Sequence, residues 1–165
     1  MLELVLVAAL LQEEDCVLWR LPVEPPVILA EVKARKARAV VAELWCGHTP
    51  WFEVMTSIER GDRAWLEVAA ALEEGTDGGA SYDLGIAISR ALPHNPRGVL
   101  KRFGASPCGG LEAAHSRADA IDLLNRQERM VTLLSDPKLV RARTECLAAI
   151  RTTRRDLLPI AQFEK

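Results

Sequence analysis

The sequence has few aromatic residues, no excess of either charge and no hydrophobic run long enough to cross a membrane. Aromatic residues make up 5% of the 165 residues, and the formal net charge is −2 at pH 7. This balance excludes the global basic field that marks many nucleic-acid-binding domains, so we expect no nucleic-acid partner. The longest apolar run, Met1 to Leu11, is shorter than the about 20 residues of a transmembrane helix, so we expect no integral membrane segment.

The composition is that of a globular protein. Hydrophobic residues account for 49% and charged residues for 27% of the chain, which excludes disordered and collagen-like sequences. The length suits one domain that buries a core without metals or disulfides. We expect a single helical domain over residues 26–165. Residues 1–25 precede it, and their apolar run is either a short buried element or the remnant of an export signal without its basic start.

The four cysteines allow two interpretations. Cys16, Cys46, Cys108 and Cys146 include no C-x-x-C pair, so a zinc ribbon or a thioredoxin-like motif is unsupported. In one interpretation all four are reduced and act as small hydrophobic side chains of a cytoplasmic protein. In the other, Cys108 pairs with Cys146 across 38 residues, which would stabilise the fold by about 4 kcal/mol in the chain-entropy model and would indicate an oxidising compartment.

Capping signals divide the chain into helices. A capping side chain stands before a proline at Thr49-Pro50, Asn95-Pro96 and Asp136-Pro137, a pattern typical of a helix N-terminus. Apolar residues recur at helical spacing between these points. The signals together predict helices over about 27–46, 50–60, 62–72, 81–92, 96–103 and 116–134, and a last helix that follows Pro137.

No segment shows the alternating pattern of a strand between two turns, so we predict an all-α fold. Six or seven antiparallel helices would form either an irregular bundle or a HEAT- or armadillo-like stack of hairpins. Pro50, Pro96 and Pro137 lie 46 and 41 residues apart, which matches a two-helix repeat of about 40–47 residues. Gly85 lies inside a predicted helix, where it costs about 1 kcal/mol relative to alanine; we expect a neighbouring helix to approach it closely.

The cysteine and histidine residues do not form a recognisable reaction centre. Cys46 and His48 are the best metal-ligand pair, but His94, Cys108 or His115 would have to complete the site, whereas zinc sites usually have ligands at paired spacings. Cys108 with His94 or His115 resembles a nucleophile and its base, but the signatures of cysteine proteases are absent. We therefore predict no catalytic residues, no metal site and no cofactor.

An acidic connection and an aromatic pair are the best candidates for contact with a partner. Adjacent carboxylates at a helix end point in different directions, so Glu73 and Glu74 do not fit a glycosidase pair. Trp51 and Phe52 are also adjacent and cannot share one narrow helical stripe, so at least one should face outward, where aromatic residues often anchor a partner. We predict partner contacts at Trp51, Phe52, Glu73, Glu74, Asp77 and His94.

Two motifs within about residues 40–150 are similar to a pattern of small exported helical proteins of proteobacteria. They run from Ile58 to Leu66 (I-x-x-G-D-x-x-W-L) and from Ala91 to Leu100 (A-L-x-x-N-P-x-x-V-L), and Cys108 and Cys146 also fit the pattern. Some proteins of this kind resemble immunity proteins that neutralise secreted cell-wall amidases. The resemblance implies a cell-wall-degrading effector as partner. It also implies a periplasmic location if Cys108 and Cys146 are bonded, and a cytoplasmic one otherwise.

These observations favour a non-enzymatic module that binds another protein. It would act as an inhibitor or immunity protein that occludes the active site of a bacterial effector enzyme with a loop or a helix face. One alternative is a hydrolase or metal-binding protein that uses the cysteine and histidine residues. A second alternative is a structural helical-repeat scaffold, which would form homo-oligomers through a large apolar self-contact.

Overall fold

Residues 17–157 are described by the computed structural model, and they fold into helices and connections without any strand. The all-α prediction is therefore confirmed, whereas the prediction for Met1 to Leu11 lies outside the described residues. The helices in this range are α1 (Pro25–Arg35), α2 (Ala37–Cys46), α3 (Thr49–Glu59), α4 (Arg63–Glu73), α5 (Gly78–Ala91), α6 (Pro96–Phe103), α7 (Arg117–Thr132), the 3₁₀-helix η1 (Pro137–Leu139) and α8 (Val140–Leu157).

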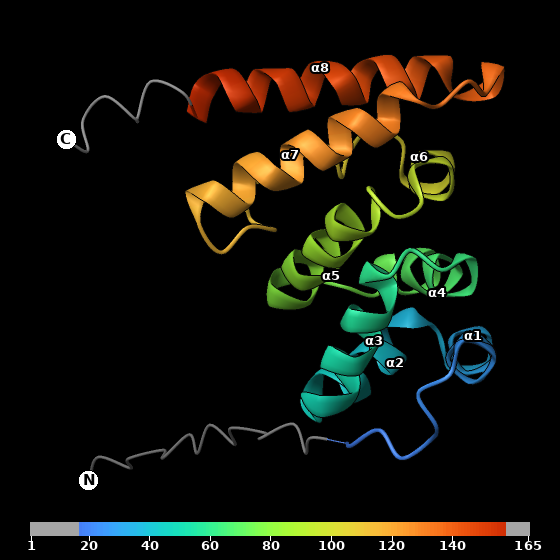
Figure 1. Ribbon diagram of the computed structural model, residues 1–165. Coiled ribbons are helices and arrows are strands. Elements are labelled where there is room, and N and C mark those ends of the chain that lie inside the picture. The colour runs from blue at the N-terminus through green and yellow to red at the C-terminus, as the bar shows by residue number, and fades with distance from the viewer. Residues whose placement is uncertain (1–16, 158–165) are drawn as a thin grey trace, which may run out of the picture.

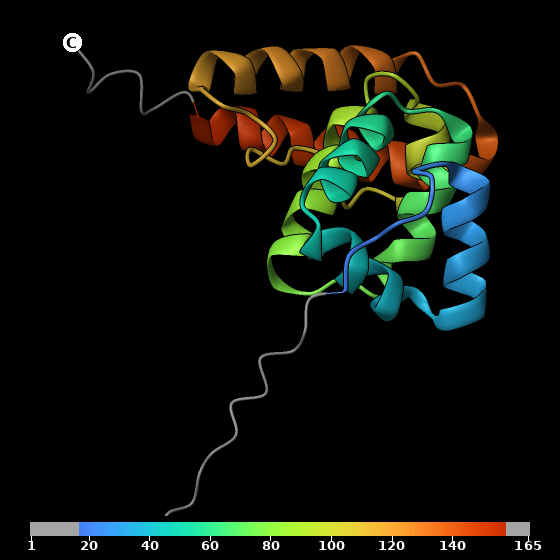
Figure 2. The same ribbon diagram turned by 90° about the horizontal axis from the view of Figure 1, so that it is seen from below.

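The helices are stacked so that the chain climbs from one end of the molecule to the other (Figure 1). The first four helices form one end, α5 and α6 lie in the middle, and α7 and α8 run side by side at the opposite end. The start of α7 and the end of α8 project past the remaining helices, as the view from below also shows (Figure 2). Packing is not confined to chain neighbours, since α1 contacts α4 and α3 contacts α5.

One hydrophobic core runs through the whole stack. Ile28, Leu44 and Leu72 are buried at the end formed by the first helices, and Leu124 and Ile150 are buried between α7 and α8. Trp19, which precedes α1, is also buried in this core. Every α-helix contributes buried residues to this core, as do Cys108 and Leu139 between them, which explains why apolar residues recur at helical spacing throughout the sequence.

The two sequence motifs each contain a turn, at Gly61-Asp62 and at Asn95-Pro96, and these turns contact each other. Asn95 caps α6, because its side-chain oxygen accepts a hydrogen bond from the backbone N–H of Gly98 at 2.8 Å. Its side-chain nitrogen donates to the carbonyl oxygen of Gly61 at 2.8 Å. Gly61 has a φ of +75°, and a Cβ there would lie 3.0 Å from the Cβ of His94. The Gly61-Asp62 and Asn95-Pro96 motifs are thus capping elements that join two connections.

The expected helix over 27–46 is in fact two helices, and this division brings the number of α-helices to eight within residues 17–157. Lys36 separates them with a φ of +76° and a ψ of 152°, a conformation that costs a residue with a side chain about 1–3 kcal/mol. The break lets the chain turn where α2 meets the end of α4. There, a Cβ at Gly75 would lie only 2.4 Å from the carbonyl carbon of Ala37.

Two other helix starts differ from the prediction. Helix α5 begins at Gly78, with Asp77 at the N-cap position, and not at Ser81. Asp136 caps the short 3₁₀-helix η1, since its side chain accepts from the N–H of Lys138, and α8 follows directly. Ser116 caps α7 as its position before the apolar stripe suggests, with its hydroxyl accepting from the N–H of Asp119.

Gly85 does not serve close helix packing, so that expectation is wrong. A Cβ built at this position in α5 would meet no atom within 4 Å, and the residue is exposed. The missing side chain instead leaves space at the surface of α5, beside the site described below.

Candidate functional site

A cavity of about 290 Å³ opens beside α5, between the end of α4 and the segment that follows α6. We name it the α5 pocket. Its walls come from three separate stretches of the chain, which only the stacking of α4, α5 and α6 brings together. The lining residues are Glu73, Thr76, Ser81, Tyr82, Leu84, Gly85, Ile86, Ile88, Ser89, Phe103, Ser106, Pro107, Gly110, Glu112 and Ala113.

The floor of the α5 pocket is apolar and rigid. Leu84 and Ile88 lie one turn apart on α5 and are buried in the core, so the α5 wall is held by core packing. Phe103, at the end of α6, packs against the same core. Between these side chains Gly85 exposes the α5 backbone to open space. An occupant could therefore lie directly against the helix, which no other residue type would permit to the same extent.

The rim of the α5 pocket carries carboxylates and no cation. Glu73 and Glu112 are the charged residues of the lining, and Tyr82, which also lines the pocket, has 55% of its surface exposed. A Cβ at Gly110 would lie 3.3 Å from a carboxylate oxygen of Glu112 and 3.6 Å from the Ser89 hydroxyl. The carboxylate and the hydroxyl therefore converge on the same part of the wall.

A buried hydrogen-bond network holds the back of this wall. The side-chain nitrogen of Gln127 donates to the carbonyl oxygen and to the hydroxyl of Ser89, each at 3.1 Å. The side-chain oxygen of Gln127 accepts from the N–H of Gly109 at 3.2 Å. Gln127 is fully buried in α7. Its amide thus ties α5 to the segment after α6, because a buried amide must find partners for both of its ends.

A disulfide fixes the same segment to α8. Cys108 and Cys146 are both buried, and their sulfur atoms are bonded at 2.02 Å. The predicted pairing of Cys108 with Cys146 is therefore confirmed. Next to the bond, Gly109 has a φ of +77°, and a Cβ there would lie 2.9 Å from the hydroxyl of Thr153. The segment after α6, which forms part of the wall of the α5 pocket, therefore packs directly against α8.

The disulfide also removes the thiols that a Cys-based site would need. Cys46 is disulfide-bonded as well, and no free cysteine is found in the described part of the chain. A bonded sulfur offers neither a thiolate nucleophile nor a zinc ligand. In addition, no three histidine, cysteine, aspartate or glutamate side chains within residues 17–157 are placed to hold a metal ion.

The structure separates the two predicted aromatic contact residues. The prediction that Trp51 lies on the rim of a contact surface is wrong, because only 1% of its surface is exposed. Its indole nitrogen donates to a carboxylate oxygen of Asp83 in α5 at 3.1 Å, and its ring packs edge-on against Trp45. Phe52 is 62% exposed, as expected for one residue of an adjacent helical pair.

The predicted acidic residues and His94 lie in different places. Glu73, Glu74, Asp77 and His94 are all exposed. Glu73 lines the α5 pocket, and Asp77 lines a separate hollow with Arg38 and Trp45. His94 lines a third hollow between the end of α5 and the start of α7. The structure therefore brings only Glu73 of the predicted contacts to the α5 pocket.

The hollow beside His94 is lined by Arg90, whose guanidinium group already has partners within the protein. Arg90 donates from Nη1 to Glu59 at 2.9 Å and from Nε to the carbonyl oxygen of Ala113 at 2.9 Å. Its Nη2 lies 3.0 Å from Nε2 of His115. With each nitrogen engaged, Arg90 serves to anchor the segment before α7.

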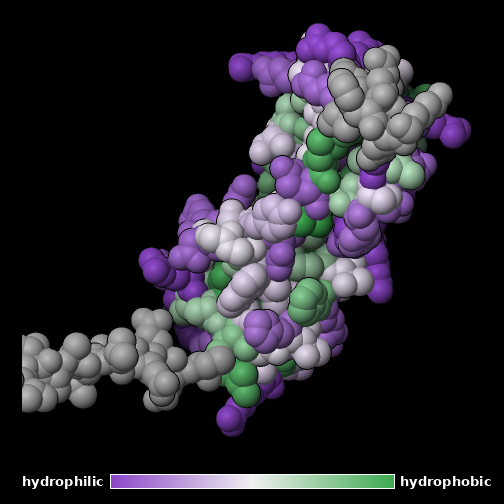
Figure 3. Space-filling model, turned by 90° about the vertical axis from the view of Figure 1, so that its left-hand side faces the viewer, coloured by the Kyte–Doolittle hydropathy of each residue, from purple (hydrophilic) through white to green (hydrophobic). Residues whose placement is uncertain are grey.

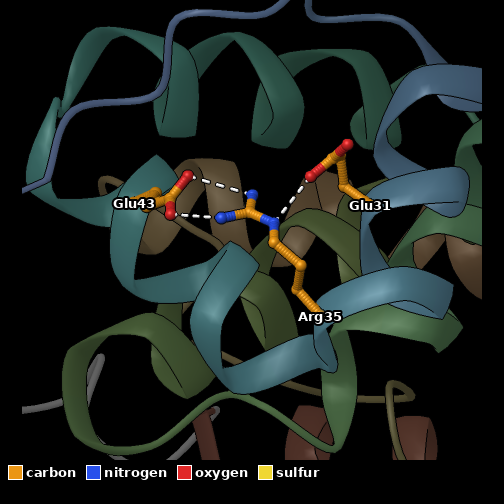
Figure 4. Close-up of polar contacts among 3 residues, drawn as sticks. All are labelled: Glu31, Arg35 and Glu43. Atoms are coloured by element: carbon orange, nitrogen blue, oxygen red, sulfur yellow. Dashed lines mark hydrogen bonds and ion pairs between the residues drawn. The ribbon is translucent and has the colours of Figure 1, made fainter.

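Another arginine spans the break between α1 and α2 (Figure 4). Arg35 donates from Nε to Glu31 at 2.6 Å and from Nη2 to Glu43 at 3.0 Å, and Nη1 also contacts Glu43. The hydrogen bonds to Glu43 are the main reason that the pKa of Arg35 is raised above its ordinary value. These contacts link the two helices across Lys36. They give Arg35 a structural role.

The described residues on the face of the molecule drawn in Figure 3 form no single broad apolar area. On the face drawn in Figure 3, hydrophobic side chains form small separate patches, and hydrophilic side chains gather at the end where α7 and α8 lie.

Sequence reasoning missed Tyr82, Phe103 and Glu112 as residues of the α5 pocket. Their only signal in the sequence was their nearness to Gly85 and to Cys108, whose roles depend on the fold.

No family model, curated protein or solved structure matches the chain. Within residues 17–157, every helix is too short or too polar to serve as a transmembrane span.

Proposed function

We propose that this protein is a non-enzymatic module that binds and inhibits another protein, and that it acts as an immunity protein against a cell-wall-degrading effector. The observation that carries the proposal is the α5 pocket. It combines a rigid apolar floor at Leu84 and Ile88 with an exposed aromatic side chain, Tyr82. Concave sites of this kind, in which an aromatic residue borders an apolar floor, are typical of places where a partner anchors a side chain.

The architecture around the pocket supports a docking role. The Gln127 amide and the Cys108–Cys146 disulfide fix its back wall. A preorganised wall reduces the entropy that binding would otherwise cost. The disulfides are also compatible with an oxidising compartment, and the periplasm is the compartment that a cell-wall amidase partner would require. The effector itself is proposed from the resemblance of the two turn motifs.

Inhibition of peptidoglycan hydrolysis tests this function. Purified oxidised protein is added in increasing amounts to secreted cell-wall amidases, including any encoded beside its gene, and release of soluble peptide from peptidoglycan is measured. We expect one amidase to be inhibited at a one-to-one ratio. Unchanged hydrolysis by all of them would contradict the immunity role, and release of peptide by this protein alone would contradict a non-enzymatic function.

A further inference from the structure

We propose that the α5 pocket receives a single lysine or arginine side chain of the protein partner. The inference rests on the proposed protein-binding function and names the chemistry that the pocket recognises. It combines three properties of the pocket: its unpaired carboxylates, its apolar floor and the open space at Gly85.

The carboxylates of the pocket have no counter-charge in the described part of the chain. Neither Glu73 nor Glu112 forms an ion pair there, and the lining contains no lysine, arginine or histidine. Some other carboxylates of the described residues are paired with arginines, such as Glu59 with Arg90, Glu67 with Arg102, and Glu128 with Arg151 and Arg154. Two unpaired acids beside one cavity therefore create a local negative potential that a cation from outside would complement.

The shape of the pocket fits a long side chain with a charged end. Its volume of about 290 Å³ exceeds what one lysine or arginine side chain needs. The methylene stem would lie on Leu84, Ile88 and Phe103, because long cationic side chains bury their stems against apolar surface. The charged end would then reach the carboxylates at the rim, where Tyr82 can present its ring face to a cation.

Gly85 is the feature that makes room for this stem. A side chain at position 85 would project into open space at the pocket, since a Cβ there meets nothing within 4 Å. Retaining glycine inside a helix costs about 1 kcal/mol relative to alanine, and no neighbouring helix requires it. Glycine at position 85 is explained by the access that it gives an occupant of the pocket to the backbone of α5.

Binding of small amide probes tests the chemistry of the pocket directly. Amide chemical shifts of the isotope-labelled protein are followed while N-acetyl-argininamide, N-acetyl-lysinamide or the neutral N-acetyl-norleucinamide is added. We expect the two cationic probes to shift the signals of Gly85, Tyr82 and Glu112, and the neutral probe to bind at least about tenfold more weakly. Equal binding of the neutral probe, or shifts confined to other surfaces, would overturn the proposal.

Three variants separate charge from shape. Glu73→Gln combined with Glu112→Gln removes the charge, and Gly85→Leu fills the space; each should weaken the cationic probes about tenfold or more. Glu74→Gln is the matched control, because Glu74 is exposed next to Glu73 but does not line the pocket. Helical circular dichroism and thermal unfolding establish that each variant is folded. Probe binding by the double glutamine variant at the wild-type level would overturn the proposal even if Gly85→Leu failed to fold.

The same variants distinguish this inference from the proposed function. If wild-type protein inhibits an amidase and the double glutamine variant inhibits it equally well, the protein-binding function stands and the cationic pocket is wrong. If the cationic probes bind the pocket but no amidase is inhibited, the pocket chemistry stands and the immunity function is wrong. We expect the double glutamine variant to raise the inhibition constant at least about tenfold, with Glu74→Gln unchanged.

Discussion

The side-chain amide of Gln127, fully buried in α7, donates to both the carbonyl oxygen and the hydroxyl of Ser89 in α5. The same amide accepts a hydrogen bond from the N–H of Gly109. One side chain thereby joins three segments that are distant in the sequence, and two of them, α5 and the segment after α6, form walls of the α5 pocket.

Removal of this amide should cost much of the stability of the fold. Gln127→Ala leaves the N–H of Gly109 without a partner in the interior, and an unsatisfied buried polar group costs about 1–3 kcal/mol; the lost packing adds to this cost. The free energy of unfolding is measured by urea denaturation. Arg129→Ala, an exposed position on the same helix, should change stability by less than about 0.5 kcal/mol. Equal effects of the two substitutions would contradict the role of the network.

The Cys108–Cys146 disulfide should contribute substantially to stability. The bond closes a loop of 38 residues, and the chain-entropy model assigns about 4 kcal/mol to such a link, with about 2–4 kcal/mol typical of measured cases. The double variant Cys108→Ser, Cys146→Ser should therefore show a lower midpoint of urea unfolding. The comparison is made without reductant, so that the disulfide of Cys46 remains intact. A double variant as stable as the wild type would show that the link contributes little.

Local signals made the helices predictable. Asn95 and Ser116 cap helices through contacts three residues along the chain, and such contacts depend only on local sequence. The break at Lys36 was missed because the contact that accompanies it depends on the fold. Gly75, which follows α4, lies against the backbone of Ala37 at the start of α2. Sequence periodicity alone reads both sides of such a break as one continuous helix.

The pocket was much harder to predict than the helices. Its charged rim combines Glu73 with Glu112, which are far apart in the sequence, so no motif spacing could indicate it. Gln127 did leave a signal, since it is a polar residue one helical turn from Leu124 and Val131 on the buried face of α7. A polar side chain at a core position indicates a buried network, but its partners Ser89 and Gly109 became identifiable only in the fold.

Two glycines should respond to alanine in opposite directions. Gly85→Ala adds a methyl group in open space and removes the cost of glycine in a helix, so stability should rise by up to about 1 kcal/mol. Gly75→Ala would place a Cβ 2.4 Å from the carbonyl carbon of Ala37. The backbone must then shift, which should lower stability by about 1–3 kcal/mol. Thermal unfolding of the two variants checks both signs, and a destabilised Gly85→Ala would contradict the open space beside α5.

Glu128 should make the free energy of unfolding depend on pH in the acidic range. Its pKa is lowered from its ordinary value, mainly because Arg151 donates a hydrogen bond to its carboxylate at 3.0 Å, with a further contribution from Arg154. A carboxyl group with a lower pKa in the folded state stabilises the fold when it is ionised. That contribution is complete above the unfolded-state pKa of 4.5 and is lost as the pH falls through the folded-state pKa.

Glu128→Gln isolates this contribution, because it removes the charge and keeps the shape. We expect it to lower the free energy of unfolding at pH 7 by about 1 kcal/mol, since the carboxylate is only 23% exposed and holds two arginines of α8. The loss should shrink as the pH is lowered from about 5 to about 2. Glu145→Gln is the control, because Glu145 pairs with an arginine whose side chain is 91% exposed, and exposed pairs contribute little. A loss from Glu128→Gln that stayed constant down to pH 2 would show that the ion pairs between α7 and α8 are not its origin.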